Sequence, residues 1–202
     1  VMMPRIANEF RKGHQKQISA LLHQAAKTSI FFACSLVFGM ISLSEKLIPW
    51  YLGEDFLPTI YAIQIISPII ITNTLSGISG NQYFTATNQL GVLLKAHVSA
   101  AIGNIILNAL LIPKMGFIGA AIATVFSSAA CAAVQYYYFT KQIKLSGLLK
   151  DTMKYFAFSA IMYLIIECFT EKLSAKPITN LFQFGIGVIV YFLLCFLFKD
   201  RQ

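Results

Sequence analysis

Amide side chains recur at helical spacing in two apolar stretches of the sequence. Asn73, Asn81 and Gln82 lie in the first stretch, and Asn104 and Asn108 lie in the second. Positions about four apart share one face of an α-helix. Because an amide both donates and accepts hydrogen bonds, a row of amides can bind water or the hydroxyl groups of a polar ligand.

The apolar surroundings of these amides limit where they can point. An amide that faced lipid would leave its donors unpaired, at a cost of several kcal/mol each. The five side chains must therefore face protein or water. Hydrogen bonding between helices is one arrangement, and the wall of a water-filled cavity is the other. We take the lining of a substrate cavity as the hypothesis for all five.

Two further groups of residues accompany the amides. His97 lies on the same helical stripe as Asn104, so it is a candidate for proton coupling, while an interfacial position near the helix end is the alternative. Gly119, Ala123 and Ser127 repeat every four residues. Such a row of small residues predicts close packing against a neighbouring helix.

The sequence shows no catalytic constellation. It contains no Gly-rich phosphate loop, no HExxH motif and no GxSxG motif. Glu167 and Glu171 stand four apart without a partner His or Asp, which favours a solvated helix end. The cysteines and histidines lack the spacing of a zinc site. We therefore predict no enzyme activity, no metal and no cofactor.

The composition indicates an integral membrane protein. Of 202 residues, 57% are hydrophobic and only 12% are charged, whereas about 25% of residues are charged in an average soluble domain. The apolar residues also form long blocks. The net charge of +8 is explained by basic loops rather than by nucleic acid, since no motif for nucleic-acid binding accompanies it.

Six apolar segments are long enough to cross a bilayer, which takes about 20 residues. They lie near residues 25–48, 58–86, 91–113, 117–140, 150–171 and 177–198. Pro68 falls within the second segment, where we expect a kink. For residues 10–27 we expect a loop with a short amphipathic helix at the membrane surface.

The loops predict the orientation. Twelve Lys and Arg residues fall on the side that holds both ends of the chain, and four fall on the other side. The positive-inside rule places the first side in the cytoplasm. We therefore expect a multi-pass protein of the cell membrane with both ends of this chain cytoplasmic.

Four motifs, in order along the chain, carry a resemblance to a known family. They are VMMPRIANEF, WYLGEDFLPTIYAIQIISPIIITNTLSGISGNQYFTATNQ, LNALLIPKMG and FIGAAIATVFSS. This order resembles the C-terminal part of a polysaccharide flippase of the O-antigen, capsule or teichoic type. That family belongs to the multidrug/oligosaccharidyl-lipid/polysaccharide exporter superfamily.

The resemblance implies an all-α, polytopic membrane helical bundle that forms the C-terminal part of a two-lobe flippase. Residues 1–24 would be the end of a preceding span and a basic cytoplasmic loop. Residues 25–140 would form the four-helix part of the C-terminal lobe, and residues 141–202 two extra transmembrane helices. The chain would then be the C-terminal part of a longer protein.

The implied function is translocation of undecaprenyl-pyrophosphate-linked oligosaccharide repeat units from the inner to the outer leaflet by alternating access. Related members export drugs or flip the peptidoglycan lipid precursor. Implied partners are the lipid-linked oligosaccharide, membrane lipids, and a polysaccharide polymerase with its chain-length machinery. Nucleic acid is not among them.

One departure and two alternatives stay open. Relatives often carry Glu just after the GAAIAT-type segment, whereas this chain has Ser127 and Ser128, which puts the coupling mechanism in question. A cation-coupled multidrug exporter would be expected to have an aromatic or acidic cavity. A non-transport membrane enzyme of polysaccharide assembly would need longer external loops with basic and acidic residues.

Overall fold

Each long apolar block of the sequence forms a helix, which satisfies its backbone hydrogen bonds within the segment. The computed structural model describes residues 2–145 and 147–198, and within these ranges it contains no strand. The elements are α1 (Met2–Arg11), α2 (Gln15–Tyr51), η1 (Glu54–Phe56), α3 (Pro58–Ile66), α4 (Ile69–Ser76), η2 (Gly77–Phe84), α5 (Leu90–Met115), α6 (Phe117–Thr140), α7 (Leu148–Thr170) and α8 (Pro177–Leu197). The predicted all-α class is confirmed.

Six of these helical segments are long and apolar enough to cross a membrane, counting the described residues. They are α2, the continuous segment Pro58–Phe84 made of α3, α4 and η2, and the helices α5, α6, α7 and α8. The six predicted spans are confirmed, and their ends differ from the prediction by a few residues except at the start of α2. The protein is a multi-pass membrane protein.

The expectation of a separate surface helix within residues 10–27 is wrong. α1 ends at a turn where Gly13 has φ +72°, and α2 then begins at Gln15 and runs on into the membrane-spanning part. Residues 15–27 contain no Pro or Gly and many strong helix formers, so nothing stops the helix there.

Across the turn between α1 and α2, a hydrogen bond with His14 holds the pKa of the Glu9 carboxyl below its ordinary value.

The second span is interrupted at the expected kink. α3 ends at Ile66 and α4 begins at Ile69, with Ser67 and Pro68 between them. Proline has no N–H for the helical ladder, so the Gln64 carbonyl receives no α-helical bond from Pro68. Just before the break, the Ile63 carbonyl accepts from both the N–H and the hydroxyl of Ser67, at 2.9 Å and 2.6 Å. The kink predicted at Pro68 is therefore confirmed.

The same span continues as a π-helix, η2. Its backbone hydrogen bonds join residues five apart, as in the bond from the N–H of Thr85 to the carbonyl of Gly80 at 2.9 Å. It ends in a turn where Asn88 has φ +57°, a left-handed conformation that Asn tolerates better than most residues. The chain reverses there and enters α5.

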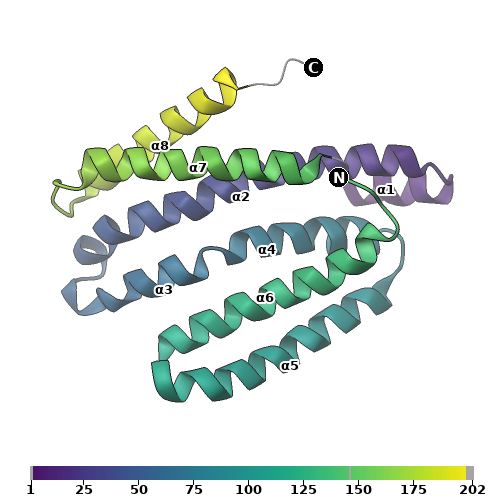
Figure 1. Ribbon diagram of the computed structural model, residues 1–202, viewed down its shortest axis with the longest axis horizontal. Coiled ribbons are helices and arrows are strands. Elements are labelled where there is room, and N and C mark those ends of the chain that lie inside the picture. Colours follow the sequence, from purple (N-terminus) through teal and green to yellow (C-terminus); the bar gives the residue numbers. More distant parts are fainter. Residues whose placement is uncertain (1, 146, 199–202) are drawn as a thin grey trace.

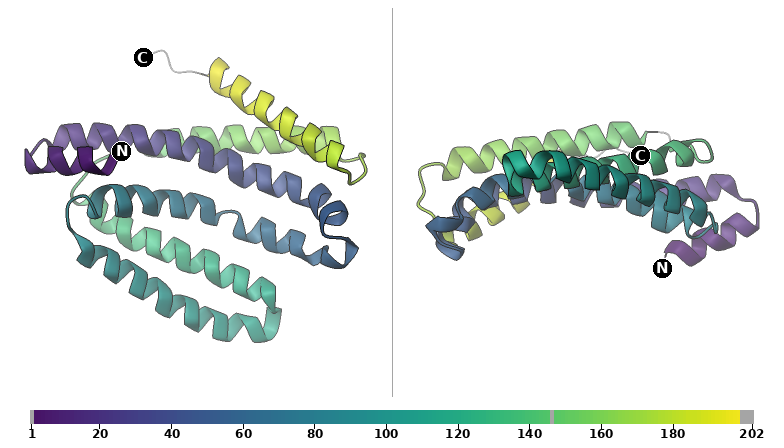
Figure 2. Two further views of the ribbon diagram at one scale, coloured as in Figure 1. Left: turned by 180° about the vertical axis from the view of Figure 1, so that it is seen from behind. Right: turned by 90° about the horizontal axis from the view of Figure 1, so that it is seen from below.

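The helices form a thin layer. Figure 1 shows α2, the α3–α4 segment, α6 and α5 side by side in that order, and contacts between the neighbours agree with this arrangement. α7 and α8 pack against α2 and against each other. The view from below in Figure 2 shows a slab much thinner than it is long. Such a layer exposes apolar faces, including Ile102, Ile105 and Leu110 of α5.

One end of the layer gathers the starts of α2, α5 and α7 and the ends of η2 and α6 (Figure 1). We call this the basic end, because Lys16, Lys27, Lys141, Lys144 and Lys150 lie there. A buried apolar cluster holds it together. The cluster joins Ile6 of α1, Leu22 of α2, Phe84 of η2, Phe139 of α6 and Ile143 of the α6–α7 connection, among other residues.

Candidate functional site

A groove lies between α4, α5 and α6 and includes the middle of each helix. Its volume is about 340 Å³. The lining residues are Ile69, Asn73 and Ser76 of α4, His97, Ala100, Ala101 and Asn104 of α5, and Thr124, Ser127, Ser128 and Cys131 of α6. We call it the polar groove. None of these lining residues is Asp, Glu, Lys or Arg, so the groove offers hydrogen-bonding groups without a fixed charge.

Hydroxyl and amide groups connect α4 with α6 along one wall of the polar groove. The hydroxyls of Thr72 and Ser128 are 2.6 Å apart, and Ser128 donates to Oδ1 of Asn73 at 3.0 Å. The Asn73 side chain is exposed toward the groove. Its oxygen is therefore held by α6, which fixes the direction of the amide and presents its N–H₂ group as a donor.

Asn104 of α5 lies on the opposite wall, and a second asparagine of the same helix, Asn108, contacts it. Nδ2 of Asn108 donates to Oδ1 of Asn104 at 2.8 Å, one helical turn away. Asn104 lines the groove, whereas Asn108 lies just beyond it. Oδ1 of Asn108 is buried and has no hydrogen-bond partner among the described residues. The structure thus gives Asn108 the position of a residue that orients Asn104.

The other two predicted cavity residues lie outside the polar groove. Asn81 is exposed, and Gln82 is half-buried with an Oε1 atom that has no hydrogen-bond partner within the described part of the chain. The helical stripe that linked Asn73 with Asn81 assumed α-helical turns of 3.6 residues. The wider turns of η2 rotate the later positions away from the α4 face.

A chain of polar contacts leads from the groove into the protein. Nδ1 of His97 lies 3.6 Å from Sγ of Cys131, and Nε2 of Gln135 lies 3.5 Å from the same sulfur. The Ser79 hydroxyl donates to Oε1 of Gln135 at 3.0 Å. Gln135 is only 1% exposed, so the groove is connected through α6 to the buried side of η2.

The small-residue row of α6 faces its neighbours closely. Gly119 lies against the backbone of Leu111 in α5, Ala123 is fully buried, and Ser127 is nearly so. The Ser127 hydroxyl bonds to the Ala123 carbonyl at 2.7 Å. The close approach at Gly119 and the burial of Ala123 support the packing role that we predicted for the row, while Ser127 also reaches the polar groove.

Sequence reasoning singled out Ser128 only as a departure from relatives that carry Glu there, and it did not assign Cys131 or Gln135 to this site. A signal was present for two of them, because Cys131 and Gln135 continue the four-residue period of Gly119, Ala123 and Ser127. Ser128 lies one position off that row and carried no such signal. Its importance depends on the contact with α4, which is distant in sequence.

A second polar network fixes α8 to α2 at the end opposite the basic end. Nε1 of Trp50 donates to Oδ1 of Asn180 at 2.6 Å, and Nδ2 of Asn180 donates to Oε1 of Gln183 at 3.0 Å. Nε2 of Gln183 donates in turn to the Ser42 carbonyl and to the Thr170 hydroxyl. We call these residues the α8 anchor, since they join three helices.

Fold and groove together define a polytopic α-helical membrane protein with an uncharged polar groove among apolar helices. The sequence profile of the family described as "Lipid II flippase MurJ" matches residues 1–192. The chain belongs to this family. The earlier resemblance is therefore confirmed at the level of a flippase family for lipid-linked sugars, and the polysaccharide branch stays a prediction.

Two curated relatives and one solved structure are similar to the chain. The "Probable low-salt glycan biosynthesis flippase Agl15" of Haloferax volcanii is 24% identical over 200 residues, covering 98% of this chain and 42% of the relative. An uncharacterized membrane protein of Methanocaldococcus jannaschii is 29% identical over 195 residues, covering 95% of this chain and 37% of that protein.

The solved structure is described as "Lipid II flippase MurJ, inward closed conformation". It matches with a TM-score of 0.78 and 24% identity, over 98% of this chain and 42% of that chain. This likeness shows the fold. The chain spans less than half the length of each of these proteins.

Proposed function

We propose that the protein moves a lipid-linked oligosaccharide from the inner to the outer leaflet by alternating access, for export of a cell-surface polysaccharide. The carrier would be undecaprenyl pyrophosphate. The observation that carries the proposal is the polar groove, an amide- and hydroxyl-lined surface at the middle of apolar helices. Membership of the MurJ family and the description of the Haloferax relative as a glycan biosynthesis flippase support the substrate class.

The groove suits the glycan because it presents donors and acceptors without fixed charge. Asn73 and Asn104 would hydrogen-bond sugar hydroxyls that otherwise lose their water in the membrane. Asn108 would keep Asn104 in place. His97 lines the same groove as these amides, and we retain it as the candidate for coupling.

The lipid tail needs a different surface. A mostly apolar cleft of about 170 Å³ lies between α2, α7 and α8, lined by side chains such as Leu36, Met40, Met162 and Phe184. A polyprenyl chain could lie there or remain in the bilayer while the glycan crosses. The pyrophosphate would need basic residues, and the lining of the polar groove supplies none.

The orientation is part of the proposal. The basic end would face the cytoplasm, because cytoplasmic loops carry an excess of Lys and Arg. Both ends of the chain would then be cytoplasmic, and a polysaccharide polymerase with its chain-length machinery would meet the product on the outer side.

Replacing Asn104 with Leu tests the proposal. We expect transport by the intact protein to fall about tenfold or more, because the leucine removes a hydrogen-bonding group that the glycan would use in place of water. The measurement is the amount of lipid-linked oligosaccharide that remains on the inner leaflet of cells that depend on the variant.

The control is Asn8→Leu, the same substitution at an exposed position of α1 outside the groove. Its transport should match the unsubstituted protein at equal membrane level. Full transport by both Asn104→Leu and Asn73→Leu would contradict the role of the polar groove.

A further inference from the structure

A second groove lies at the basic end, apart from the polar groove. Its volume is about 560 Å³, and its lining residues are Lys16, Ser19, Ala20, His23, Gln24 and Lys27 of α2, with Lys144 of the α6–α7 connection. We call it the basic groove. All of its lining residues except Ala20 carry a polar or charged group.

The wall that carries Lys144 is held firmly against α2. The Ser19 hydroxyl donates to the Lys144 carbonyl at 2.9 Å. On either side of Lys144, Ile143 and Leu148 are buried in the same apolar cluster as Leu22. Lys144 is therefore positioned opposite the α2 lysines by packing and by a hydrogen bond, although its own side chain is exposed.

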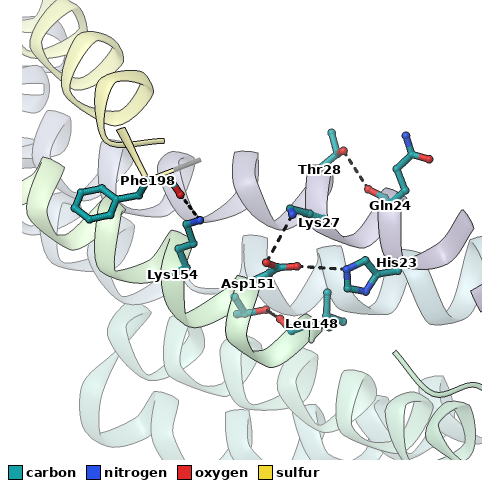
Figure 3. A network of polar contacts seen from close by, with 9 residues as sticks. His23, Gln24, Lys27, Thr28, Leu148, Asp151, Lys154 and Phe198 are labelled. Atoms are coloured by element: carbon teal, nitrogen blue, oxygen red, sulfur yellow. Dashed lines mark hydrogen bonds and ion pairs between the residues drawn. The ribbon is translucent and has the colours of Figure 1, made fainter. Parts of the chain in front are cut away.

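The charges of the basic groove are only partly compensated. Asp151 of α7 lies between His23 and Lys27, with oxygen–nitrogen distances of 3.4 Å and 3.8 Å (Figure 3). Among the described residues, no carboxylate lies within ion-pair distance of Lys16 or Lys144. Three lysines against one aspartate leave an excess of two positive charges, before any proton on His23 is counted.

The groove follows a helix that enters the membrane. Lys16 and Lys27 lie eleven residues apart on α2, which corresponds to roughly 16 Å along the helix axis. The apolar run of α2 begins just after Lys27, at residues 30–34. The Lys27 end therefore lies at the boundary of the hydrocarbon, where lipid phosphates are found, and the Lys16 end extends into water.

We propose that the basic groove binds the phosphate of an anionic membrane lipid. Lys27 would lie closest to the bilayer, Lys16 and Lys144 would supply the uncompensated charge, and Ser19 and Gln24 would hydrogen-bond the rest of the headgroup. Lysines near a membrane surface attract acidic lipids in this way. Lipid binding at the basic groove does not require the proposed transport activity, so this proposal can hold or fail independently of the substrate of the polar groove.

The test is the affinity of the intact protein for phosphatidylglycerol, titrated in detergent micelles and followed by the rise in unfolding temperature. We expect the double variant Lys16→Gln and Lys144→Gln to weaken the apparent affinity about tenfold, because it removes the two uncompensated charges. Phosphatidylcholine should give little shift with either protein. The charge-conserving pair Lys16→Arg and Lys144→Arg should retain the affinity.

The matched control is Lys172→Gln with Lys176→Gln, which changes the net charge equally at exposed positions of the opposite end. An equal loss of affinity in this control would overturn the site, because total charge would then explain the binding. Unchanged affinity in the Lys16 and Lys144 variant would overturn it as well. A shift of the same size with inorganic pyrophosphate alone would reject a lipid ligand in favour of a soluble anion.

Discussion

Replacing Gly119 with alanine is expected to destabilise the protein by about 1–3 kcal/mol, the usual cost of overpacking a tight contact. A Cβ atom at this position would lie 2.6 Å from the carbonyl oxygen of Leu111 and 2.7 Å from its carbonyl carbon. Backbone atoms cannot rotate away as a flexible side chain can. The helices α5 and α6 must therefore separate, and they would carry two walls of the polar groove with them.

Thermal unfolding of the purified protein in detergent measures this effect. The matched control is Gly103→Ala on α5, where an added Cβ meets no atom within 4 Å. Alanine is favoured over glycine in a helix by about 1 kcal/mol, so the control should unfold at the same temperature or higher. Equal unfolding temperatures for the two variants would show that the close contact at Gly119 does not hold the helix pair.

Replacing Gln183 with alanine is expected to cost about 3 kcal/mol through loss of the α8 anchor. The side chain is 1% exposed. It donates to the Ser42 carbonyl at 3.3 Å and to the Thr170 hydroxyl at 3.1 Å, and it accepts from Asn180. Alanine removes all three bonds and leaves a small cavity, and each buried group left without a partner costs about 1–3 kcal/mol.

Hydrogen exchange measured by mass spectrometry can show where the Gln183→Ala variant loses stability and by how much. Exchange should increase in α8 and in the neighbouring part of α2, while α5 and α6 stay protected. The control Gln24→Ala removes an exposed side chain of the same type and should change stability by no more than about 0.5 kcal/mol. Uniformly faster exchange over all helices would contradict a local anchor.

The membrane spans could be predicted from the sequence because their signal is local. Each span is a continuous apolar block, and prolines such as Pro58 and Pro177 mark where helices begin. The start of α2 could not be placed from hydropathy, since its first turns are rich in polar residues. The helix continues there because its residues have high helix propensity, which a hydropathy profile does not measure.

The polar groove could be predicted only in part. Asn73 and Asn104 reach the groove because α4 and α5 are regular where they carry these residues. Asn81 and Gln82 do not reach the groove, because the π-helical turns of η2 change the direction in which their side chains point. No feature of the sequence predicts a π-helix there. The contact between Ser128 and Thr72 could not be predicted, because the two residues lie on different helices. Contacts between helices of this kind have no periodic signal.

The break between α3 and α4 has a mechanical consequence for the polar groove. Without an N–H on Pro68, the carbonyl of Gln64 receives no α-helical bond from it, so bending at this point sacrifices less than bending an unbroken rod such as α6. Ile69 and Asn73, which follow directly, belong to the lining. A bend at this point would move the α4 wall relative to α5 and α6, and it would have to break the hydrogen bonds that join Thr72 and Asn73 to Ser128.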